Sequence, residues 1–280
     1  MKQVVILLIA VLMLAASGPA HAGGENWLGL DGKLLSFEGD LHGVLEFTML
    51  TEYIWRGFDV WAPDTAGIQG SVDLDLYGSG IGISAMFHRA MPAGYEMGER
   101  WDYTVYYQNS IYASEPYATN YRIGWVYYNF PQAKASWFDL HELQMILAWP
   151  NILPVKGLCP SYAAVGLWPM YENNLFTGDA AGWAHIFMLD YGWTLTGILP
   201  EVPEQVVNFH GELVYNDGVD PRGIGVDHDW SNWVIGASTD FDCGYNVTLT
   251  PALYYQRTMD KSVNLSPDET WFTLSAKYTF

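Results

Sequence analysis

The sequence predicts an all-β fold: a transmembrane antiparallel up-and-down β-barrel of about 12 strands. Segments of about ten residues alternate between apolar and polar side chains along most of the chain, which is the pattern of strands in such barrels. The composition is 50% hydrophobic and 16% aromatic but only 15% charged, whereas soluble domains carry roughly 25% charged residues. The 28 Gly and 14 Pro indicate many turns and argue against long helices.

Residues 1–22 have the features of a cleaved secretory signal peptide. Lys2 precedes an apolar run that ends in an A-x-A cleavage pattern. A retained membrane anchor is the alternative, although the run is short for a transmembrane helix. We expect residues 23–40, which are Gly-rich and show no period, to form a short periplasmic N-terminal segment. Residues 41–280 are expected to form the outer-membrane β-barrel.

Twelve segments alternate with a period of two, and bacterial barrels have an even number of strands. The second segment alternates almost without exception and leads through a tight Gly turn into the third. Pro169 inside the seventh indicates a bulge or a strand end. In chain order the expected strands are Leu41–Trp55, Ile68–Leu76, Ile81–Arg89, Glu99–Ser110, Asn120–Phe130, Leu140–Trp149, Ser161–Tyr171, Gly182–Trp193, Gln205–Asn216, Trp230–Thr239, Tyr245–Gln256 and Thr270–Phe280.

The connections between these segments fall into two alternating sets. Barrels have short periplasmic turns and longer outside loops, so we expect the longer, acid-rich set to face outward. The shorter set comprises Tyr77–Gly80, Asn151–Pro160, Thr194–Glu204 and Asp240–Gly244, with Ser110–Asn120 as a long member. The longer set comprises Gly57–Gly67, Ala90–Glu99, Pro131–Asp139, Glu172–Ala181, Asp217–Asp229 and Arg257–Glu269.

Aromatic side chains gather near the ends of the expected strands, for example Trp101 and Tyr103 in the fourth. This fits the aromatic girdles that barrels carry at both membrane interfaces. The alternative is a secreted soluble sandwich, because one buried sheet face gives the same alternation.

If the apolar parity of each strand faces lipid, the polar parity lines the lumen. The candidate lumen-lining residues are Glu46, Glu52, Arg56, Asp73, Asp75, His88, Asp102, Arg122, His210, Glu212 and Lys277. With 12 basic against 31 acidic residues in the chain, a net acidic lumen would favour small cations or neutral solutes. The alternative is that these charges pair across a narrow barrel and fill it.

The first and last strands of a closed barrel lie side by side. We therefore expect Lys277, near the end of the last strand, to approach Glu46 or the Asp73 and Asp75 pair.

Several stretches resemble the TorF-type porins, a family of bacterial outer-membrane β-barrels. They are Leu50–Phe87, with its aromatic-Arg-Gly turn and paired strands, Tyr121–Ala133, with its Gly-x-x-Tyr-Tyr run, and the Phe-terminal strand. The resemblance implies an outer-membrane barrel of porin type and carries over no catalytic residue. It draws attention to Arg56, Gly57, Gly124, Tyr127, Tyr128 and Pro131, which also have purely structural interpretations.

The last strand also resembles the C-terminal recognition signal of outer-membrane barrels, which the barrel-assembly machinery reads. The residues that carry this resemblance are Phe272, Leu274, Tyr278 and Phe280. It implies that this strand both closes the barrel and directs its assembly in the outer membrane of a Gram-negative cell.

Other functions find little support in the sequence. A nucleic-acid partner is not expected, because phosphate binding needs a basic surface. No motif announces an enzyme or a cofactor. His228 between Asp227 and Asp229 is a possible metal-binding tip, but acidic loops are usually solvated or bind divalent cations loosely, and that interpretation is preferred. Cys159 and Cys243 lie in an exported chain, where a disulfide can form, and their pairing is left open.

The sequence thus predicts a porin-like outer-membrane channel for passive diffusion of small solutes, and no enzyme. The alternatives are a non-conducting barrel that anchors or scaffolds, and an outer-membrane lipid-modifying enzyme. The sequence leaves open which solute passes, whether the lumen is open or plugged, and the oligomeric state.

Overall fold

The computed structural model describes residues 41–171, 180–199, 202–220 and 228–280. The expected signal peptide and the periplasmic segment, residues 1–40, lie outside the described residues. Within the described part, no helix is long and apolar enough to cross a membrane.

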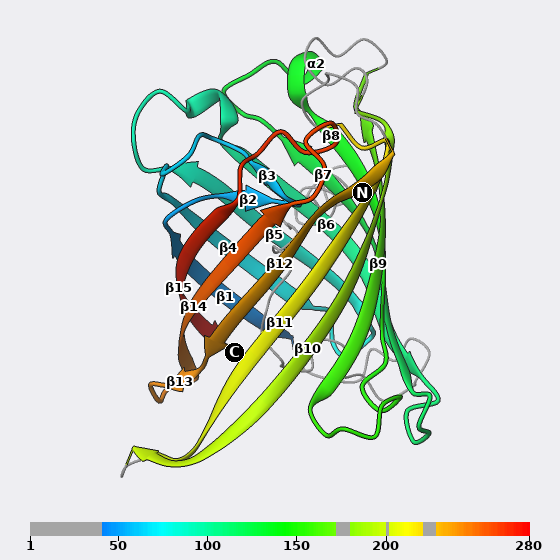
Figure 1. The fold of residues 1–280 in the computed structure, drawn as a ribbon, viewed down its shortest axis with the longest axis vertical. Helices are drawn as coiled ribbons and strands as arrows, with labels where there is room; N and C mark the ends of the chain where they lie inside the picture. The colour runs from blue at the N-terminus through cyan, green and yellow to red at the C-terminus, as the bar shows by residue number, and fades with distance from the viewer. Residues whose placement is uncertain (1–40, 172–179, 200–201, 221–227) are drawn as a thin grey trace, which may run out of the picture.

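Twelve long strands of the described chain form one closed antiparallel barrel (Figure 1). They are β1 (His42–Leu50), β4 (Gly67–Asp75), β5 (Ile81–Ala90), β6 (Arg100–Ile111), β7 (Thr119–Asn129), β8 (Leu140–Ala148), β9 (Leu158–Pro169), β10 (Gly182–Leu199), β11 (Val202–Asp217), β12 (Asp229–Thr239), β14 (Val247–Thr258) and β15 (Glu269–Thr279). Each pairs with its neighbours along the chain, and β15 returns to pair with β1. The predicted fold class and strand number are confirmed.

The smaller elements lie in the connections. They are β2 (Ile54–Trp55), β3 (Phe58–Asp59), the 3-10 turn η1 (Glu96–Gly98), the single helical turn α2 (Ala135–Phe138) and β13 (Phe241–Asp242).

The ladder between β1 and β15 closes the barrel. Glu46 stands opposite Lys277 in the register of this pair, as the closure argument expects. Beyond the last ladder residues, Gly43 and Phe280 exchange two backbone hydrogen bonds of 2.9 and 3.0 Å. The two strand ends therefore lie at the same end of the barrel, together with the tight β4–β5 turn (Figure 1).

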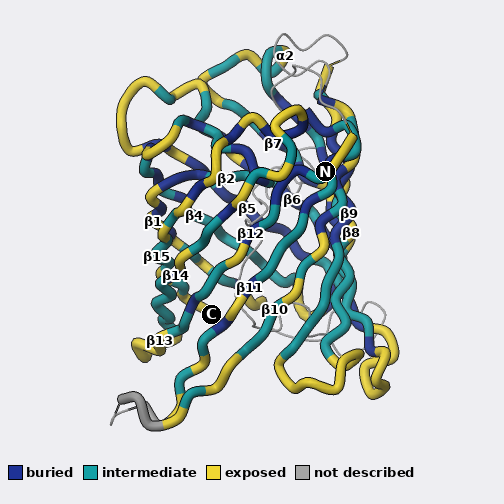
Figure 2. Tube along the Cα trace, viewed as in Figure 1, coloured by how far each residue is buried: buried dark blue, intermediate teal, exposed yellow. Residues whose placement is uncertain are grey.

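Many large apolar side chains of the strands are exposed, and exposed positions are interspersed with buried ones along the strands of the barrel (Figure 2). The alternation of β1 shows why: Leu45, Phe47 and Met49 are exposed, and Thr48 between them is buried. Further outward apolar residues include Trp125, Leu143, Phe187, Leu189, Ile235, Leu253 and Phe272. An apolar outer band on a closed barrel is built for contact with lipid, so the structure places the chain in the bacterial outer membrane.

Two strand boundaries differ from the sequence expectation. The first strand ends at Leu50 and not at Trp55, because the chain turns inward there and Trp55 and Tyr53 are covered by other strands. The expected turn at 194–204 is largely strand, since β10 and β11 stay paired from Thr194↔Val206 to Leu199↔Val202. This ribbon extends past both neighbouring strands at the lower end of the barrel (Figure 1).

Candidate functional site

Residues 51–66, between β1 and β4, fold into the lumen at the end of the barrel away from the C-terminus (Figure 1). We call this segment the strap, and we call this end of the lumen the outer end and the opposite one the inner end. Its centre is a two-stranded hairpin in which Ile54 pairs with Asp59 and Trp55 with Phe58. Arg56 and Gly57 make the turn with φ angles of 51° and 88°. A side chain at Gly57 would meet Asn232 and Asn264, so both the conformation and the close approach require glycine.

Arg56 joins the tip of the strap to β8. Its two Nη atoms donate to the two carboxylate oxygens of Glu142, which is fully buried. Glu142 also accepts a hydrogen bond of 2.6 Å from Gln144 Nε2. A buried carboxylate with a bidentate guanidinium and a third donor is well satisfied.

The opposite side of the turn is held by β14 and its loop. The carbonyl oxygen of Gly57 accepts hydrogen bonds from Gln256 Nε2 and Asn264 Nδ2, both of 2.8 Å. Since β8 and β14 are five strands apart in a ring of twelve, these contacts lie on nearly opposite walls. The strap therefore crosses the lumen from one wall to the other.

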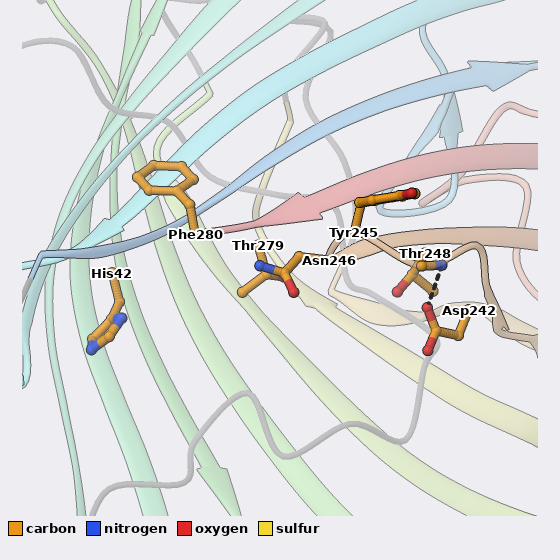
Figure 3. Close-up of a pocket in the computed structure, with 8 residues that line it drawn as sticks. His42, Asp242, Tyr245, Asn246, Thr248, Thr279 and Phe280 are labelled. Atoms are coloured by element: carbon orange, nitrogen blue, oxygen red, sulfur yellow. Dashed lines mark hydrogen bonds between the residues drawn. The ribbon is translucent and has the colours of Figure 1, made fainter.

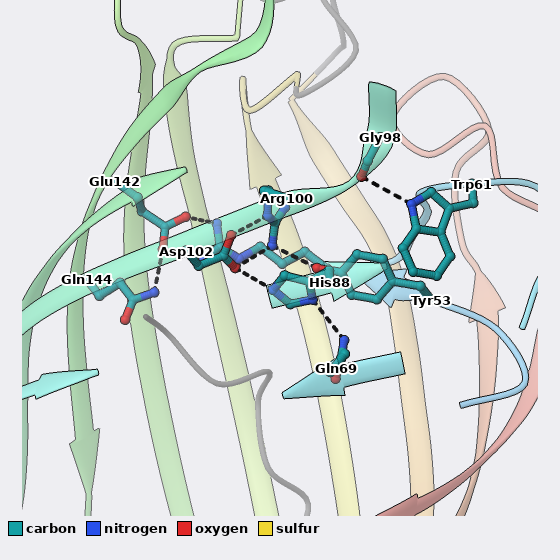
Figure 4. Close-up of polar contacts among 10 residues, drawn as sticks. Tyr53, Trp61, Gln69, His88, Gly98, Arg100, Asp102, Glu142 and Gln144 are labelled. Atoms are coloured by element: carbon teal, nitrogen blue, oxygen red, sulfur yellow. Dashed lines mark hydrogen bonds and ion pairs between the residues drawn. The ribbon is translucent and has the colours of Figure 1, made fainter. Parts of the chain in front are cut away.

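A third wall holds the strap through a buried polar network on β4, β5 and β6 (Figure 4). Arg100 Nη2 donates to Tyr53 Oη at 2.7 Å and pairs with Asp102 through Nε at 2.5 Å. His88 bridges Asp102 at 2.7 Å and Gln69 at 3.0 Å. The Arg100 guanidinium also lies 4.5 Å from the ring centre of Tyr128 and 4.8 Å from that of Trp55.

The remaining side of the strap packs against apolar residues that face inward from β7 to β11. Trp55 contacts a cluster that includes Val126, Tyr128, Leu140, Val165, Leu167, Ile186 and Val214. The strap therefore contacts polar side chains on three sides and apolar side chains on the fourth, and these contacts fill much of the outer end of the lumen.

Outside the contacts of the strap, polar side chains line the wall in three groups. Asp73 accepts a 2.5 Å hydrogen bond from Tyr106, and Arg122 lies 3.8 Å from Asp73 with its guanidinium over the Tyr106 ring. His210 lies 2.7 Å from Asp190 and 3.7 Å from Glu212. A smaller group joins Thr48 to Ser275 at 2.7 Å and to Glu46 at 3.3 Å.

The predicted lumen residues on strands lie on the parity opposite the exposed apolar side chains. They are Glu46, Asp73, His88, Asp102, Arg122, His210, Glu212 and Lys277. Asp75, on the same parity at the lower end of β4, accepts from the backbone N–H of Gly78 and caps the turn. Whether these residues act in solute passage stays a prediction.

Glu52 and Arg56 are placed differently from the expectation. They were expected on the first strand, but both belong to the strap, because that strand ends two residues before Glu52. Glu52 lies at the base of the strap and Arg56 at its tip, so neither is part of the barrel wall.

Several residues of the site are absent from the sequence-based candidates. They are Tyr53, Arg100, Tyr106, Glu142, Asp190, Gln256 and Asn264. Arg100 and Glu142 stand on the same parity as Asp102 and Gln144, so the alternation contained the signal. For Tyr53 and Asn264, which lie in connections, local pattern gives no such signal.

The residues of the expected assembly signal cover the outside of the closing strand. Phe272, Tyr278 and Phe280 are exposed, and the Tyr278 and Phe280 rings stack 6.0 Å apart. Leu274, on the same parity, is half-buried. Phe280 and Tyr245 also both line a shallow cavity of about 450 Å³ at the lower end of the barrel, with Thr279 and Asn246 between them (Figure 3). Recognition of these residues by the assembly machinery stays a prediction.

In the part of the chain that the structure describes, the cysteines form no disulfide and the candidate metal site is not assembled. Cys159 is half-buried and Cys243 exposed, and both are free thiols. His228 lies 2.5 Å from Asp217, and Asp227 is outside the described residues. Among the residues that the structure describes, no three His, Cys, Asp or Glu side chains are grouped to hold a metal ion.

Comparisons with known proteins bear on the fold. No family model matches the chain, and no curated protein sequence matches it. The structure is similar to the NanC porin, with a TM-score of 0.51, 11% identity, and coverage of 84% of this chain and 100% of that one. It is also similar to the KdgM porin, with a TM-score of 0.49, 9% identity, and coverage of 85% of this chain and 99% of that one. A third similar structure is the COG4313 outer membrane channel from Pseudomonas putida F1, with a TM-score of 0.49, 11% identity, and coverage of 89% of this chain and 99% of that one. The likeness to NanC shows that the chain has the closed antiparallel barrel fold of that protein.

Proposed function

We propose that this protein is a porin-like outer-membrane channel for passive diffusion of small solutes, with the strap as its constriction. The observation that carries the proposal is a closed barrel whose polar lumen is crossed at one end by a folded loop. Hydrogen-bonding groups along a lumen replace the water shell of a passing solute, and a narrow segment limits its size. The resemblance to TorF-type porins supports the same assignment.

We further propose that the channel prefers cationic or neutral solutes. On the inner part of the wall, the carboxylates outnumber the basic groups: Asp190 and Glu212 flank His210 on β10 and β11, and across the barrel Glu46 and Asp73 lie on the adjacent strands β1 and β4, near Lys277 and Arg122. Carboxylates in a narrow lumen raise the local concentration of cations.

Planar-bilayer recording of the purified protein tests both parts. We expect discrete conductance steps, and a reversal potential in a KCl gradient that shows cation preference. The double variant E46Q/E212Q should reduce that preference, whereas E115Q, at an exposed residue of a lower-end turn, should not. A flat trace over a range of salt concentrations would exclude the channel.

A non-conducting anchoring barrel is the second candidate, and the packing around Trp55 favours it. The two functions differ in what the strap does. If the strap is a constriction, the unaltered protein conducts and removing the strap enlarges that current; if the barrel is only an anchor, the unaltered protein carries no current.

A further inference from the structure

Two glutamates meet where the strap leaves the barrel wall. Glu52 is the second residue of the strap, and Glu269 is the first residue of β15. Thr51 fixes this junction, since its N–H donates to the Phe272 carbonyl at 3.0 Å and its Oγ1 accepts from the Phe272 N–H at 2.9 Å. The side chains of Glu52 and Glu269 are in hydrogen-bonding contact and are only 7% and 6% exposed.

Among the residues that the structure describes, no cationic side chain is paired with Glu52 or Glu269. Glu52 Oε2 and Glu269 Oε1 are buried without a hydrogen-bond partner. The other charged groups that act on the pair are Asp59 and Asp64 of the strap, and both are acidic. On the neighbouring strand, Gln256 stands opposite Glu269 and carries no charge.

Two adjacent carboxylates in such surroundings cannot both ionise without a large cost, as buried carboxyl pairs show in general. If one of them keeps its proton, it donates a hydrogen bond to the other, and the contact becomes attractive. We propose that Glu52 and Glu269 share one proton and so form a pH-sensitive latch that holds the base of the strap against β15. The latch depends on the strap and not on the proposed channel function.

The sign of the pH dependence follows from the surroundings of Glu52. Burial raises its pKa above the ordinary value, and the nearby Asp59 and Asp64 raise it further. A carboxyl whose pKa is raised on folding contributes its stabilisation fully below the ordinary glutamate pKa and loses it as the pH rises through the raised value. The base of the strap is therefore held at acidic pH and released as the pH rises through the raised pKa of Glu52.

Infrared difference titration of the full chain in detergent micelles tests the shared proton. We expect the C=O band of a protonated carboxyl to persist after the exposed carboxylates have ionised, and to vanish at higher pH. The band should be missing from E52Q and from E269Q. It should remain in E115Q, which removes an exposed carboxyl far from the strap.

Hydrogen exchange tests the mechanical consequence. The reporter is the Val60 N–H, which donates to the Tyr53 carbonyl at 3.1 Å within the strap. After correction for intrinsic rates, its exchange should accelerate as the pair ionises. The acceleration should be about tenfold for each pKa unit by which the pKa of the pair in the held strap exceeds that in the released strap. In E52Q the acceleration should disappear, because a glutamine donates to Glu269 at every pH.

Three results would overturn the latch. They are absence of the titrating band in the unaltered protein, a band unchanged in E52Q, and strap exchange that does not depend on pH. A last measurement repeats the hydrogen exchange with calcium added at alkaline pH. If calcium slows exchange of the Val60 N–H in a protein that shows no infrared band of a protonated carboxyl, the pair binds a cation and not a proton. A loss of conductance alone would count against the channel and leave the latch intact.

Discussion

At the scale of single residues, the buried ion pair between Arg56 and Glu142 ties the tip of the strap to the barrel wall. The variant E142Q leaves the Arg56 guanidinium, largely buried, without its counter-ion. Removing one partner of a buried pair costs about 3–5 kcal/mol, so E142Q should lower the free energy of unfolding measured by urea titration of tryptophan fluorescence.

The double variant R56M/E142L is the control for this prediction. Replacing both charges with apolar side chains leaves no buried unpaired charge, and most of the lost stability should return. Equal losses in the single and double variants would show that the pair contributes by shape and not by charge.

Gly57 gives a second residue-scale prediction, with Gly78 as its matched control. Both have positive φ, of 88° and 65°. A Cβ at Gly78 meets nothing within 4 Å, whereas one at Gly57 would meet Asn232 Cγ and Asn264 Nδ2, both at 2.7 Å. G78A should cost about 1–2 kcal/mol of backbone strain, and G57A should cost about 1–3 kcal/mol more through overpacking, measured by the same titration. Equal losses of unfolding free energy in G57A and G78A would mean that the tip of the strap can move away from Asn232 and Asn264 without strain.

At the scale of elements, the strap is an addition to the wall and not a part of it. β1 pairs with β4 and β15 from end to end without the strap. Replacing residues 53–60 with a short Gly-Ser linker should therefore leave the barrel intact and raise its conductance severalfold.

Gel mobility and bilayer recording check this prediction together. The folded deletion variant should still change mobility between unboiled and boiled samples, as we expect of the unaltered barrel. An intact barrel with unchanged conductance would show that the strap does not limit passage, and loss of the mobility change would show that the wall needs it.

At the scale of the whole molecule, closure of the barrel depends on the last residue as well as on the last strand. Phe280 forms two backbone hydrogen bonds with Gly43, and its ring packs outward over Tyr278. F280A removes only the ring, whereas deletion of Phe280 also removes the backbone bonds.

If the assembly machinery recognises the aromatic ring, both variants should insert poorly into the outer membrane while refolding in detergent like the unaltered chain. Membrane fractionation after expression measures insertion, and the mobility change on boiling measures refolding. Normal insertion of F280A would refute the ring as the recognised feature, and failure of refolding only in the deletion would identify the backbone bonds as essential for closure.

The residues of the site show how far the sequence can predict and where it stops. Side-chain direction in a strand is a local property with a period of two, so the placement of His88, Asp102 and Arg122 follows from the alternation. The same rule applied to Glu142 would have placed it among the candidate lumen residues. The contacts between such residues cannot be predicted from the alternation, because Arg56 and Glu142 are 86 residues apart and meet only in the closed barrel.

By itself, the sequence determined the all-β class, the twelve strands, the closure of the last strand on the first, and the lipid-facing parity. Each follows from local alternation and from the need to pair every backbone group in a membrane. Only the tertiary structure decided that the chain leaves the wall after Leu50. Alternation continues through Tyr53 and Trp55, and what draws them inward is burial against Arg100, Tyr128 and the strands beyond. The strap, the occupied outer lumen and the contact of Glu52 with Glu269 exist only because the barrel brings distant residues together.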